Sequence, residues 1–372
     1  MTRHATDPHA WPRDYVDGRE RFVASALAAG ARTDSLPAAA TGPGGEPLSV
    51  DVATLGPDRP EHRIVLTSAL HGVEGALGAR IQVRALEALG HEGLPDGVGV
   101  TLMHAVNPWG FAHGRRVDED NVDVNRNFLD PKAPRPPANP AYAALDPLIN
   151  PRGEPPADGL RFRLGALGLI ARERGAAPLA RAIAEGQDRF PKGLFFAGTA
   201  VGESARRLSE LLVRLSGAAG RITHLDLHSG LGPSGTATLI GATGIGAVEG
   251  REARLRAHFG QPVRLDDAPG NAYDAHGTLA RRYRSLRPDG RFLYLCVEIG
   301  TVGPLAVLAA LRRENRAHHW GVAGSTRHAE ARRALRDAFC PPSRRWRERA
   351  VGEGVHAFRR ALALPIEPAG GP

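Results

Sequence analysis

His71 and Glu74 are the residues of this sequence best placed to bind a metal ion. They lie in the run His71-Gly72-Val73-Glu74, directly after residues 63–70, whose β-branched and aliphatic side chains are typical of a buried strand. Side chains three positions apart share one side of a tight turn or of a first helical turn, so one cation can contact both. An imidazole with a carboxylate suits zinc, whose catalytic sites use three protein ligands and keep one position open.

A third candidate ligand, His228, ends a second predicted strand over residues 222–228. His224, Asp226 and His228 alternate with leucines, so these three side chains share one face of the sheet. Sites in α/β proteins lie at the carboxyl ends of strands, which favours His228 as a ligand. His224 is further from that edge, and we interpret it as a hydrogen-bonded core residue.

Glu298 lies near the end of another predicted strand, residues 292–300. A carboxylate in such an apolar strand is costly to bury unless it is paired or needed for function. Its candidate role is that of a general base, which takes a proton from water at the metal and returns it to the leaving group. A buried salt bridge is the alternative.

The polar stretch after the predicted strand at residues 99–106 supplies candidate substrate contacts. A guanidinium beside an amide forms a fork for a carboxylate, so Asn125 and Arg126 can hold a substrate carboxylate. Either Arg115 or Arg116 can polarise a carbonyl group and stabilise its oxyanion. Asp123 can hydrogen-bond the far nitrogen of a ligand imidazole and fix its tautomer. The sequence leaves the choice between the two arginines open.

The elements that must position these residues alternate along the chain. The predicted strands are residues 50–55, 63–70, 99–106, 222–228, 236–240, 263–267 and 292–300. The predicted helices are residues 15–29, 75–89, 160–174 with 179–187, 204–217, 247–259, 304–316 and, in pieces, 326–362. This alternation predicts an α/β fold of three layers, with helices on both faces of the sheet. Residues 131–156 are rich in Pro and Gly and predict a long surface loop inside a single domain that spans residues 1–372.

The composition is that of a soluble globular protein, with 372 residues, 42% apolar and 24% charged. No apolar run approaches the roughly 18 residues of a membrane helix, and the polar N-terminus has no signal-peptide pattern, which favours the cytoplasm. Cys296 and Cys340 do not form a disulfide framework. The net charge of +8 comes almost wholly from scattered arginines, so we expect neither a nucleic-acid nor a membrane partner. The oligomeric state stays open.

Taken in order, these motifs resemble the zinc metallocarboxypeptidase superfamily, which includes carboxypeptidase A-like enzymes and the aspartoacylase/succinylglutamate desuccinylase branch. The resemblance spans residues 63–301, and the chain looks most like a bacterial branch whose substrates are poorly defined. The matching residues are His71 with Glu74, Arg116 or Arg115, Asp123 with Asn125 and Arg126, His228 with Ser229, and Glu298.

The resemblance implies a mixed, mostly parallel sheet of about eight strands between helices. It also implies one Zn²⁺ per chain, bound by His71, Glu74 and His228. Glu298 would deprotonate the attacking water and then protonate the leaving nitrogen.

For the substrate, the resemblance implies that Arg116 shares the developing oxyanion with zinc, while Asn125 and Arg126 grip the terminal carboxylate. Carboxypeptidases also use a mobile tyrosine that precedes the catalytic Glu. Tyr273 is the nearest match here, and Tyr283 is its rival.

Three functions remain in competition. The leading one is a cytoplasmic zinc carboxypeptidase that acts on short peptides or modified amino acids. Its rival is an N-acyl amino-acid amidohydrolase with the same zinc site, so the expected partner is a peptide or acyl amino acid with a free carboxylate. The third is a non-catalytic binding protein on the same fold, against which Glu298 argues because binding alone needs no general base.

Overall fold

The computed structural model describes residues 11–129, 139–153, 159–172, 175, 177–243, 250–265 and 276–365. Within these residues, one eight-stranded sheet has the strand order β1-β2-β4-β3-β5-β8-β6-β7. The strands are β1 (Arg32–Thr41), β2 (Pro47–Leu55), β3 (His62–Thr67), β4 (Val98–His104), β5 (Arg221–Gly230), β6 (Ala237–Thr243), β7 (Val263–Leu265) and β8 (Phe292–Gly300).

The middle of the sheet is parallel. Strands β4, β3, β5 and β8 run in one direction, and their carboxyl ends lie at the same edge. β2 pairs antiparallel with β1 and β4, and β6 pairs antiparallel with β8 and parallel with β7. The predicted α/β fold with a mixed, mostly parallel sheet of about eight strands is confirmed. Every residue of β3 is buried, as expected of a central strand covered on both faces.

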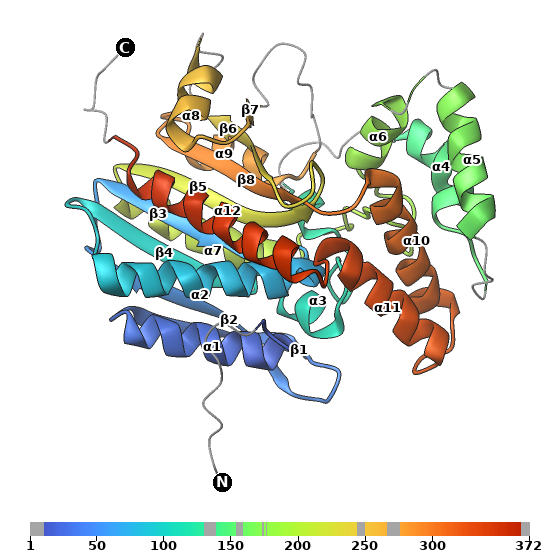
Figure 1. Cartoon of the computed structure of the whole chain (residues 1–372), viewed down its shortest axis with the longest axis horizontal. Helices are drawn as coiled ribbons and strands as arrows, with labels where there is room; N and C mark the ends of the chain where they lie inside the picture. Colours follow the sequence, from blue (N-terminus) through green and yellow to red (C-terminus); the bar gives the residue numbers. More distant parts are fainter. Residues whose placement is uncertain are drawn as a thin grey trace.

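Helices cover both faces of this sheet (Figure 1). The helices are α1 (Tyr15–Ala28), α2 (Gly75–Glu92), α3 (Pro108–His113), α4 (Pro140–Ile149), α5 (Gly159–Arg172), α6 (Ala177–Ala184), α7 (Glu203–Ala218), α8 (Arg251–Phe259), α9 (Leu279–Leu286), α10 (Pro304–Trp320), α11 (Thr326–Phe339) and α12 (Arg344–Leu362), with short 3₁₀ turns η1 (Gly72–Glu74) and η2 (Val124–Arg126). Among the described residues, none of these helices has the length and apolar character needed to cross a membrane.

The three layers follow from two buried apolar clusters. On one face, where α1, α2 and α12 lie side by side, Leu225 and Leu295 of the central strands share a cluster with Phe22 and Phe358. On the other face, a second cluster joins the sheet to α7 and α9. Helices α4, α5, α6, α10 and α11 gather beyond one end of the sheet (Figure 1).

Strand β1 is the strand that the sequence pattern does not predict. Its side chains alternate between exposed and half-buried, so it lacks an apolar face. It also contains Pro37, which an edge strand tolerates because only one side of it must pair. β1 is held at the edge of the sheet by antiparallel pairing with β2.

The sequence predicted a surface loop over residues 131–156. In the described part of that segment the prediction is wrong, because residues 140–149 form helix α4. The Asn139 side chain accepts a hydrogen bond from the Tyr142 backbone N–H, 2.9 Å away, and a proline occupies the first turn. Tyr142, Leu145 and Ile149 are buried at helical spacing. The proline that suggested a loop is thus part of a helix start.

Other boundaries differ less. Helices α3 and α9 lie outside the predicted ranges, and the predicted helical run at residues 326–362 divides into α11 and α12. The predicted strand end at residues 266–267 and helix start at residues 247–249 lie outside the described residues.

Two buried histidines should make the fold sensitive to acid. Burial lowers the pKa of His62 and of His104 from 6.5 to about 4. As the pH falls, the unfolded chain binds a proton at each histidine before the folded chain does. The free energy of unfolding should therefore fall as the pH drops from about 6.5 to about 4, by roughly 3 kcal/mol per histidine. Urea unfolding at pH 7 and at pH 4.5 measures this loss.

Replacing His62 with glutamine removes the proton site, so His62→Gln should reduce the loss of stability between the two pH values. His91 is exposed, and His91→Gln should leave the loss unchanged. Equal pH dependence in the wild type and in His62→Gln would contradict the assignment.

Candidate metal centre

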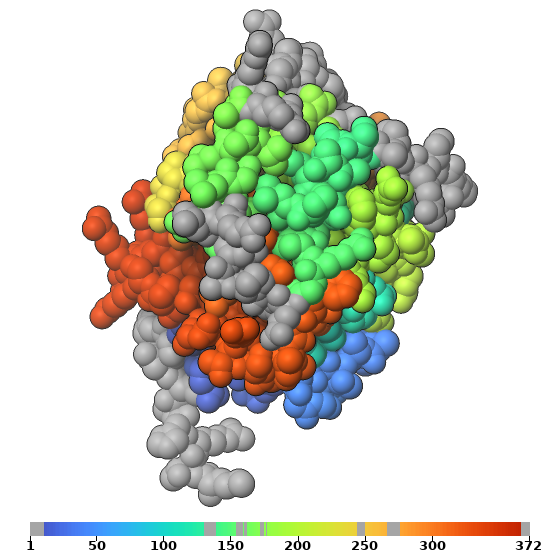
Figure 2. Space-filling model, turned by 90° about the vertical axis from the view of Figure 1, so that its right-hand side faces the viewer, coloured from blue at the N-terminus to red at the C-terminus, as the bar shows by residue number. Residues whose placement is uncertain are grey.

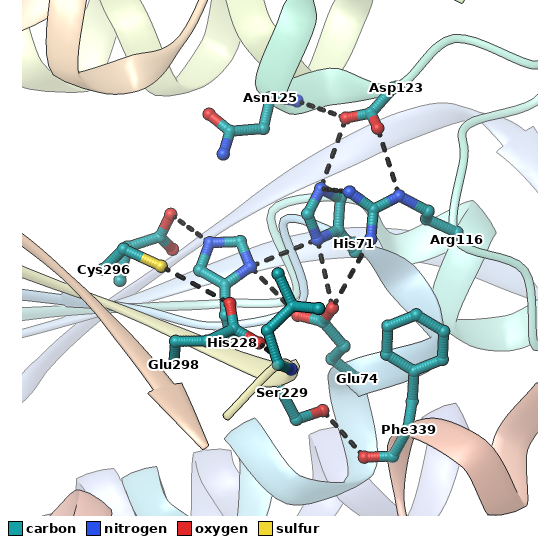
Figure 3. Close-up of polar contacts among 12 residues, drawn as sticks. His71, Glu74, Arg116, Asp123, Asn125, His228, Ser229, Cys296, Glu298 and Phe339 are labelled. Atoms are coloured by element: carbon teal, nitrogen blue, oxygen red, sulfur yellow. Dashed lines mark hydrogen bonds and ion pairs between the residues drawn. The ribbon is translucent and has the colours of Figure 1, made fainter. Parts of the chain in front are cut away.

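The candidate site lies at the carboxyl ends of β3 and β5. The chain continues from β3 to β4 on one side, whereas β5 pairs with β3 on the other side. Such a change of direction leaves a crevice where α/β proteins bind ligands. His71 follows β3 and His228 lies on β5, so the two imidazoles meet at this edge of the sheet (Figure 3).

A strained turn directs the chain from the end of β3 toward η1. Two non-glycine residues, Ala69 after β3 and Ala105 after β4, have positive φ angles of 55° and 57°. Gln82 of α2 bridges the separating strands, since its Nε2 donates to the carbonyls of Leu66 and Met103 at 3.0 Å each. Strain of this kind persists only where surrounding contacts hold it, and it is typical of functional sites.

Gly72 explains how His71 and Glu74 come to share one side of η1. A Cβ on Gly72 would lie 2.0 Å from the carbonyl carbon of Gly110, so η1 can pack this closely on α3 only with glycine at this position. The Glu74 N–H donates to the His71 carbonyl at 3.1 Å, which closes the turn.

Two imidazole nitrogens and the two oxygens of one carboxylate converge at nearly equal distances. His71 Nδ1 lies 3.1 Å from Glu74 Oε1, His228 Nδ1 lies 3.1 Å from Glu74 Oε2, and the two Nδ1 atoms are 3.1 Å apart. The side chains are 6%, 2% and 2% exposed for His71, Glu74 and His228. A tetrahedral zinc ion with bonds of about 2.0–2.1 Å places neighbouring ligand atoms roughly 3.3 Å apart. The spacing therefore fits a zinc-like cation.

The far nitrogen of His228 fixes its tautomer. His228 Nε2 lies 2.7 Å from Asp226 Oδ2, and Asp226 also accepts hydrogen bonds from the hydroxyls of Thr67 and Tyr294. A carboxylate paired in this way accepts the Nε2 hydrogen, which leaves the Nδ1 lone pair directed at Glu74.

The far nitrogen of His71 has two neighbours that compete for it. Asp123 Oδ1, an acceptor, lies 3.2 Å from His71 Nε2, and Arg116 Nη2, a donor, lies 2.8 Å from it. Only a hydrogen on Nε2 leaves Nδ1 as a lone-pair donor toward the cluster. A metal bound at Nδ1 would therefore favour the hydrogen bond from His71 to Asp123 over the contact with Arg116.

The residues fit a divalent cation. With both Nε2 hydrogens directed to carboxylates, three acceptors face one another, and Glu74 Oε2 is buried without a hydrogen-bond donor. A proton is the competitor: burial lowers the pKa of His228, but Asp226 and Glu74 outweigh burial and raise it well above its usual value. Metal binding must displace this proton, so metal affinity should fall at low pH.

Glu298 lies beside the cluster because β5 and β8 pair in register, with His228 opposite Glu298. Its Oε1 accepts the Leu231 backbone N–H at 2.8 Å, and its Oε2 faces the Cys296 thiol at 3.8 Å. Burial and the negative charge of Glu74 raise the pKa of Glu298 above its usual value. A raised pKa makes the carboxylate a stronger base, which suits a group that must accept a proton and return it.

Of the two candidate arginines, the structure brings only Arg116 to the cluster. Arg116 Nε donates to Asp123 Oδ2 at 3.1 Å, and its Nη1 lies 3.9 Å from Glu74 Oε1 (Figure 3). Arg115 is buried outside the cluster, where its Nε donates to Glu314 Oε1 at 2.8 Å. Its role is structural, because the ion pair joins the polar loop to α10.

Asn125 and Arg126 lie on η2, held in defined orientations. Asn125 Oδ1 accepts the Leu279 N–H at 3.2 Å, which leaves its amide hydrogens to donate elsewhere. Arg126 Nε donates to the carbonyl of Ala184 at 2.7 Å, and its Nη1 donates to the Asn125 carbonyl at 2.7 Å. Part of the Arg126 fork is therefore used to hold the guanidinium in place.

Tyr283 is a fixed core residue. Its hydroxyl lies 2.8 Å from His224 Nδ1, and the ring is fully buried. His224 has a second contact, since its Nε2 lies 2.7 Å from the Thr67 hydroxyl. Both contacts agree with the interpretation of His224 as a hydrogen-bonded core residue. Tyr273 lies outside the described residues.

Sequence reasoning missed Asp226 and Phe195. Asp226 is two residues before His228 on the same sheet face, and this spacing is the signal that could have identified it. Phe195 comes from a distant segment, and its ring lies 5.3 Å from the Arg116 guanidinium carbon. No local pattern around Phe195 indicates that contact.

The fold and the cluster define an α/β protein with a candidate divalent-metal centre. The chain belongs to the family described as "Protein of unknown function (DUF2817)", whose model matches residues 11–353. No curated protein matches this chain.

Solved structures similar to this chain include carboxypeptidase A from Helicoverpa armigera, at 11% identity over 95% of this chain and 75% of that chain, with a TM-score of 0.49. Bovine thrombin-activatable fibrinolysis inhibitor is 8% identical over 96% of this chain and 97% of that chain, with a TM-score of 0.49. Succinylglutamate desuccinylase from Chromobacterium violaceum is 16% identical over 87% and 77%, with a TM-score of 0.37. Because the sequence identities are 16% or lower and the TM-scores are below 0.5, the chemistry of the site is argued from the side chains of this chain.

The carboxylate behind His228 should be required for tight metal binding. In Asp226→Asn, the amide no longer enforces a hydrogen on Nε2, so zinc affinity should fall by about 10- to 100-fold. Equilibrium dialysis with Zn²⁺ at pH 7 measures it. Asp118 is another buried carboxylate that contacts backbone N–H groups but no imidazole, and Asp118→Asn should bind zinc like the wild type. Equal affinity of Asp226→Asn and the wild type would contradict the ligand set.

Proposed function

We propose that this chain is a zinc-dependent amide hydrolase of the carboxypeptidase type. It removes the C-terminal residue from short peptides, or hydrolyses modified amino acids that keep a free carboxylate. The observation that carries the proposal is Glu298, a carboxyl group with a raised pKa beside the His71–Glu74–His228 cluster. Binding a cation needs no such group, whereas hydrolysis needs a base next to the metal.

The chemistry is divided between the metal and the protein. A zinc ion held by the cluster would supply Lewis acidity, which polarises a carbonyl group and acidifies water. Glu298 Oε2 takes the proton of the attacking water, while the Leu231 N–H keeps Oε1 in place. The same carboxyl group then protonates the leaving nitrogen.

Arg116 stabilises negative charge on the carbonyl oxygen as it develops. Its guanidinium already lies at the cluster, and Asp123 holds its Nε in position. A donor fixed before the reaction needs no reorganisation when charge appears, which is the main source of such stabilisation.

Asn125 and Arg126 bind the free carboxylate of the substrate. The Asn125 amide hydrogens and the Arg126 Nη2 group, which has no hydrogen bond to a described residue, come from neighbouring residues of η2. Charge-assisted hydrogen bonds of this kind select a substrate that ends in a carboxylate.

An N-acyl amino-acid amidohydrolase is the second candidate. Val73, between the two ligands of η1, packs in an apolar cluster with side chains of α4, α6, α10 and α11. Figure 2 views the molecule from the side of these helices and shows them covering this end in green and orange. Buried ligands beneath such packing favour small substrates over extended polypeptides.

Removing the base should abolish hydrolysis but leave the metal in place. Glu298→Gln keeps the acceptor for the Leu231 N–H but cannot take a proton, so kcat should fall about 100- to 10,000-fold with zinc content unchanged. Glu353 also accepts a backbone N–H, from Ala237, and Glu353→Gln should keep full activity. Activity in Glu298→Gln equal to the wild type would remove this residue from the mechanism.

The free carboxylate should be essential in the substrate. Among C-terminally free peptides, the same peptides amidated, and N-acyl amino acids such as acetyl-aspartate and succinyl-glutamate, only substrates with a free carboxylate should be cleaved. Asn125→Ala should raise KM about 10-fold or more, because a hydrogen bond to a charged group is worth roughly 1.5–3 kcal/mol. Cleavage of acyl amino acids alone selects the second candidate, and cleavage of amidated peptides contradicts the assigned anchor.

A further inference from the structure

One segment far from the ligands in sequence holds residues 121–127 of the polar loop that follows β4. We call residues 184–202 the brace segment. Its carbonyl groups accept hydrogen bonds from the side chains of Asn121, Arg126 and Asn127 and from the Asp123 backbone N–H. The accepting carbonyls belong to Ala184, Pro191, Gly193, Phe196, Ala197 and Ala200.

Within the brace segment, Phe195 makes contact with the guanidinium at the cluster. The Arg116 guanidinium carbon lies 5.3 Å from the centre of the Phe195 ring, within the range of a cation–π interaction. Phe195 is 9% exposed, and it packs in the same apolar cluster as Val73 of η1. Its ring therefore touches the site on one side and the supporting helices on the other.

The backbone of Phe195 is strained. Its φ angle is 56°, which is rare for a bulky side chain without local polar groups. The neighbouring hydrogen bonds enforce it, since the Gln187 N–H donates to the Phe195 carbonyl at 3.1 Å and the Asp123 N–H donates to the Phe196 carbonyl at 2.8 Å. A glycine would give an easier chain path, so the aromatic residue at this position requires an explanation.

We propose that Phe195 is a positioning residue that holds the Arg116 guanidinium toward the reacting carbonyl group. This inference rests on the proposed hydrolase function. Asp123 fixes Arg116 at Nε, and the Phe195 ring limits rotation of the guanidinium plane. When His71 directs its Nε2 hydrogen to Asp123, Arg116 no longer donates to that nitrogen, and the ring then keeps the guanidinium beside the cluster.

Removing the aromatic ring of Phe195 should lower the turnover number more than it weakens substrate binding. Phe195→Leu keeps an apolar side chain but loses the ring, so kcat should fall about 10- to 100-fold while KM changes less than about threefold. Phe195→Tyr keeps the ring and should restore kcat to within about threefold of the wild type. Zinc content should be unchanged in both variants.

Phe190 provides the matched control. It also lies in the brace segment beneath an arginine, since the Arg189 guanidinium carbon is 5.6 Å from its ring centre. In the part of the chain that the structure describes, no hydrogen bond or ion pair joins Arg189 to the ligand cluster. Phe190→Leu should therefore keep wild-type kcat. Arg116→Lys combined with Phe195→Leu should be no slower than Arg116→Lys alone, because Phe195 acts through the guanidinium.

An NMR measurement that does not depend on catalytic activity tests the role of Phe195 separately from the proposed hydrolase function. The Nε–H signal of Arg116 in nitrogen-15 NMR, assigned with Arg116→Lys, should shift in Phe195→Leu and stay near its wild-type position in Phe195→Tyr and Phe190→Leu. If the wild type hydrolyses no substrate, the proposed function fails while this signal still tests the contact. An unshifted signal, or wild-type kcat in folded Phe195→Leu, overturns the role of Phe195.

Discussion

The structure depends on three acceptor atoms that face one another at the carboxyl edge of the sheet. His71 Nδ1, His228 Nδ1 and one Glu74 carboxylate lie 3.1 Å apart and have no donor between them. In a buried site this repulsion is costly, and only a shared proton or a cation relieves it. The backing carboxylates Asp226 and Asp123 each accept the Nε2 hydrogen of one imidazole, so both Nδ1 atoms face the cluster, where a cation must compete with a proton.

The surrounding layers can be understood as the support for this arrangement. The parallel pairing of β5 and β8 sets Glu298 opposite His228, and the close packing of η1 on α3 requires glycine between the first two ligands. The brace segment then fixes the polar loop through backbone carbonyls, which do not depend on side-chain identity. Support of this kind, from backbone groups and packed elements, is what a site needs where its ligands must not move.

The clustering of His71, Glu74 and His228, with Glu298 nearby, could be predicted from the sequence because strand ends, the His-x-x-Glu spacing and the late acidic strand are local signals. The sequence also predicted the α/β class from the alternation of elements. It did not predict β1, whose exposed residues lack an apolar face, or α4, whose proline resembles a loop. The choice between Arg115 and Arg116 depended on which side of the loop packs against Glu314, and the contact of Phe195 with Arg116 depends on tertiary packing over many residues. Such long-range contacts leave no periodic pattern in the chain.

The most direct measurement is X-ray absorption at the zinc edge on protein purified without chelator. A metal bound by the cluster should give about one zinc per chain, with nitrogen and oxygen neighbours at about 2.0–2.1 Å and an imidazole scattering pattern from two histidines. His228→Ala should reduce that pattern to one imidazole or empty the site. Protein without zinc, or zinc whose neighbours are unchanged in His228→Ala, would contradict the central claim that His71, Glu74 and His228 form a metal centre.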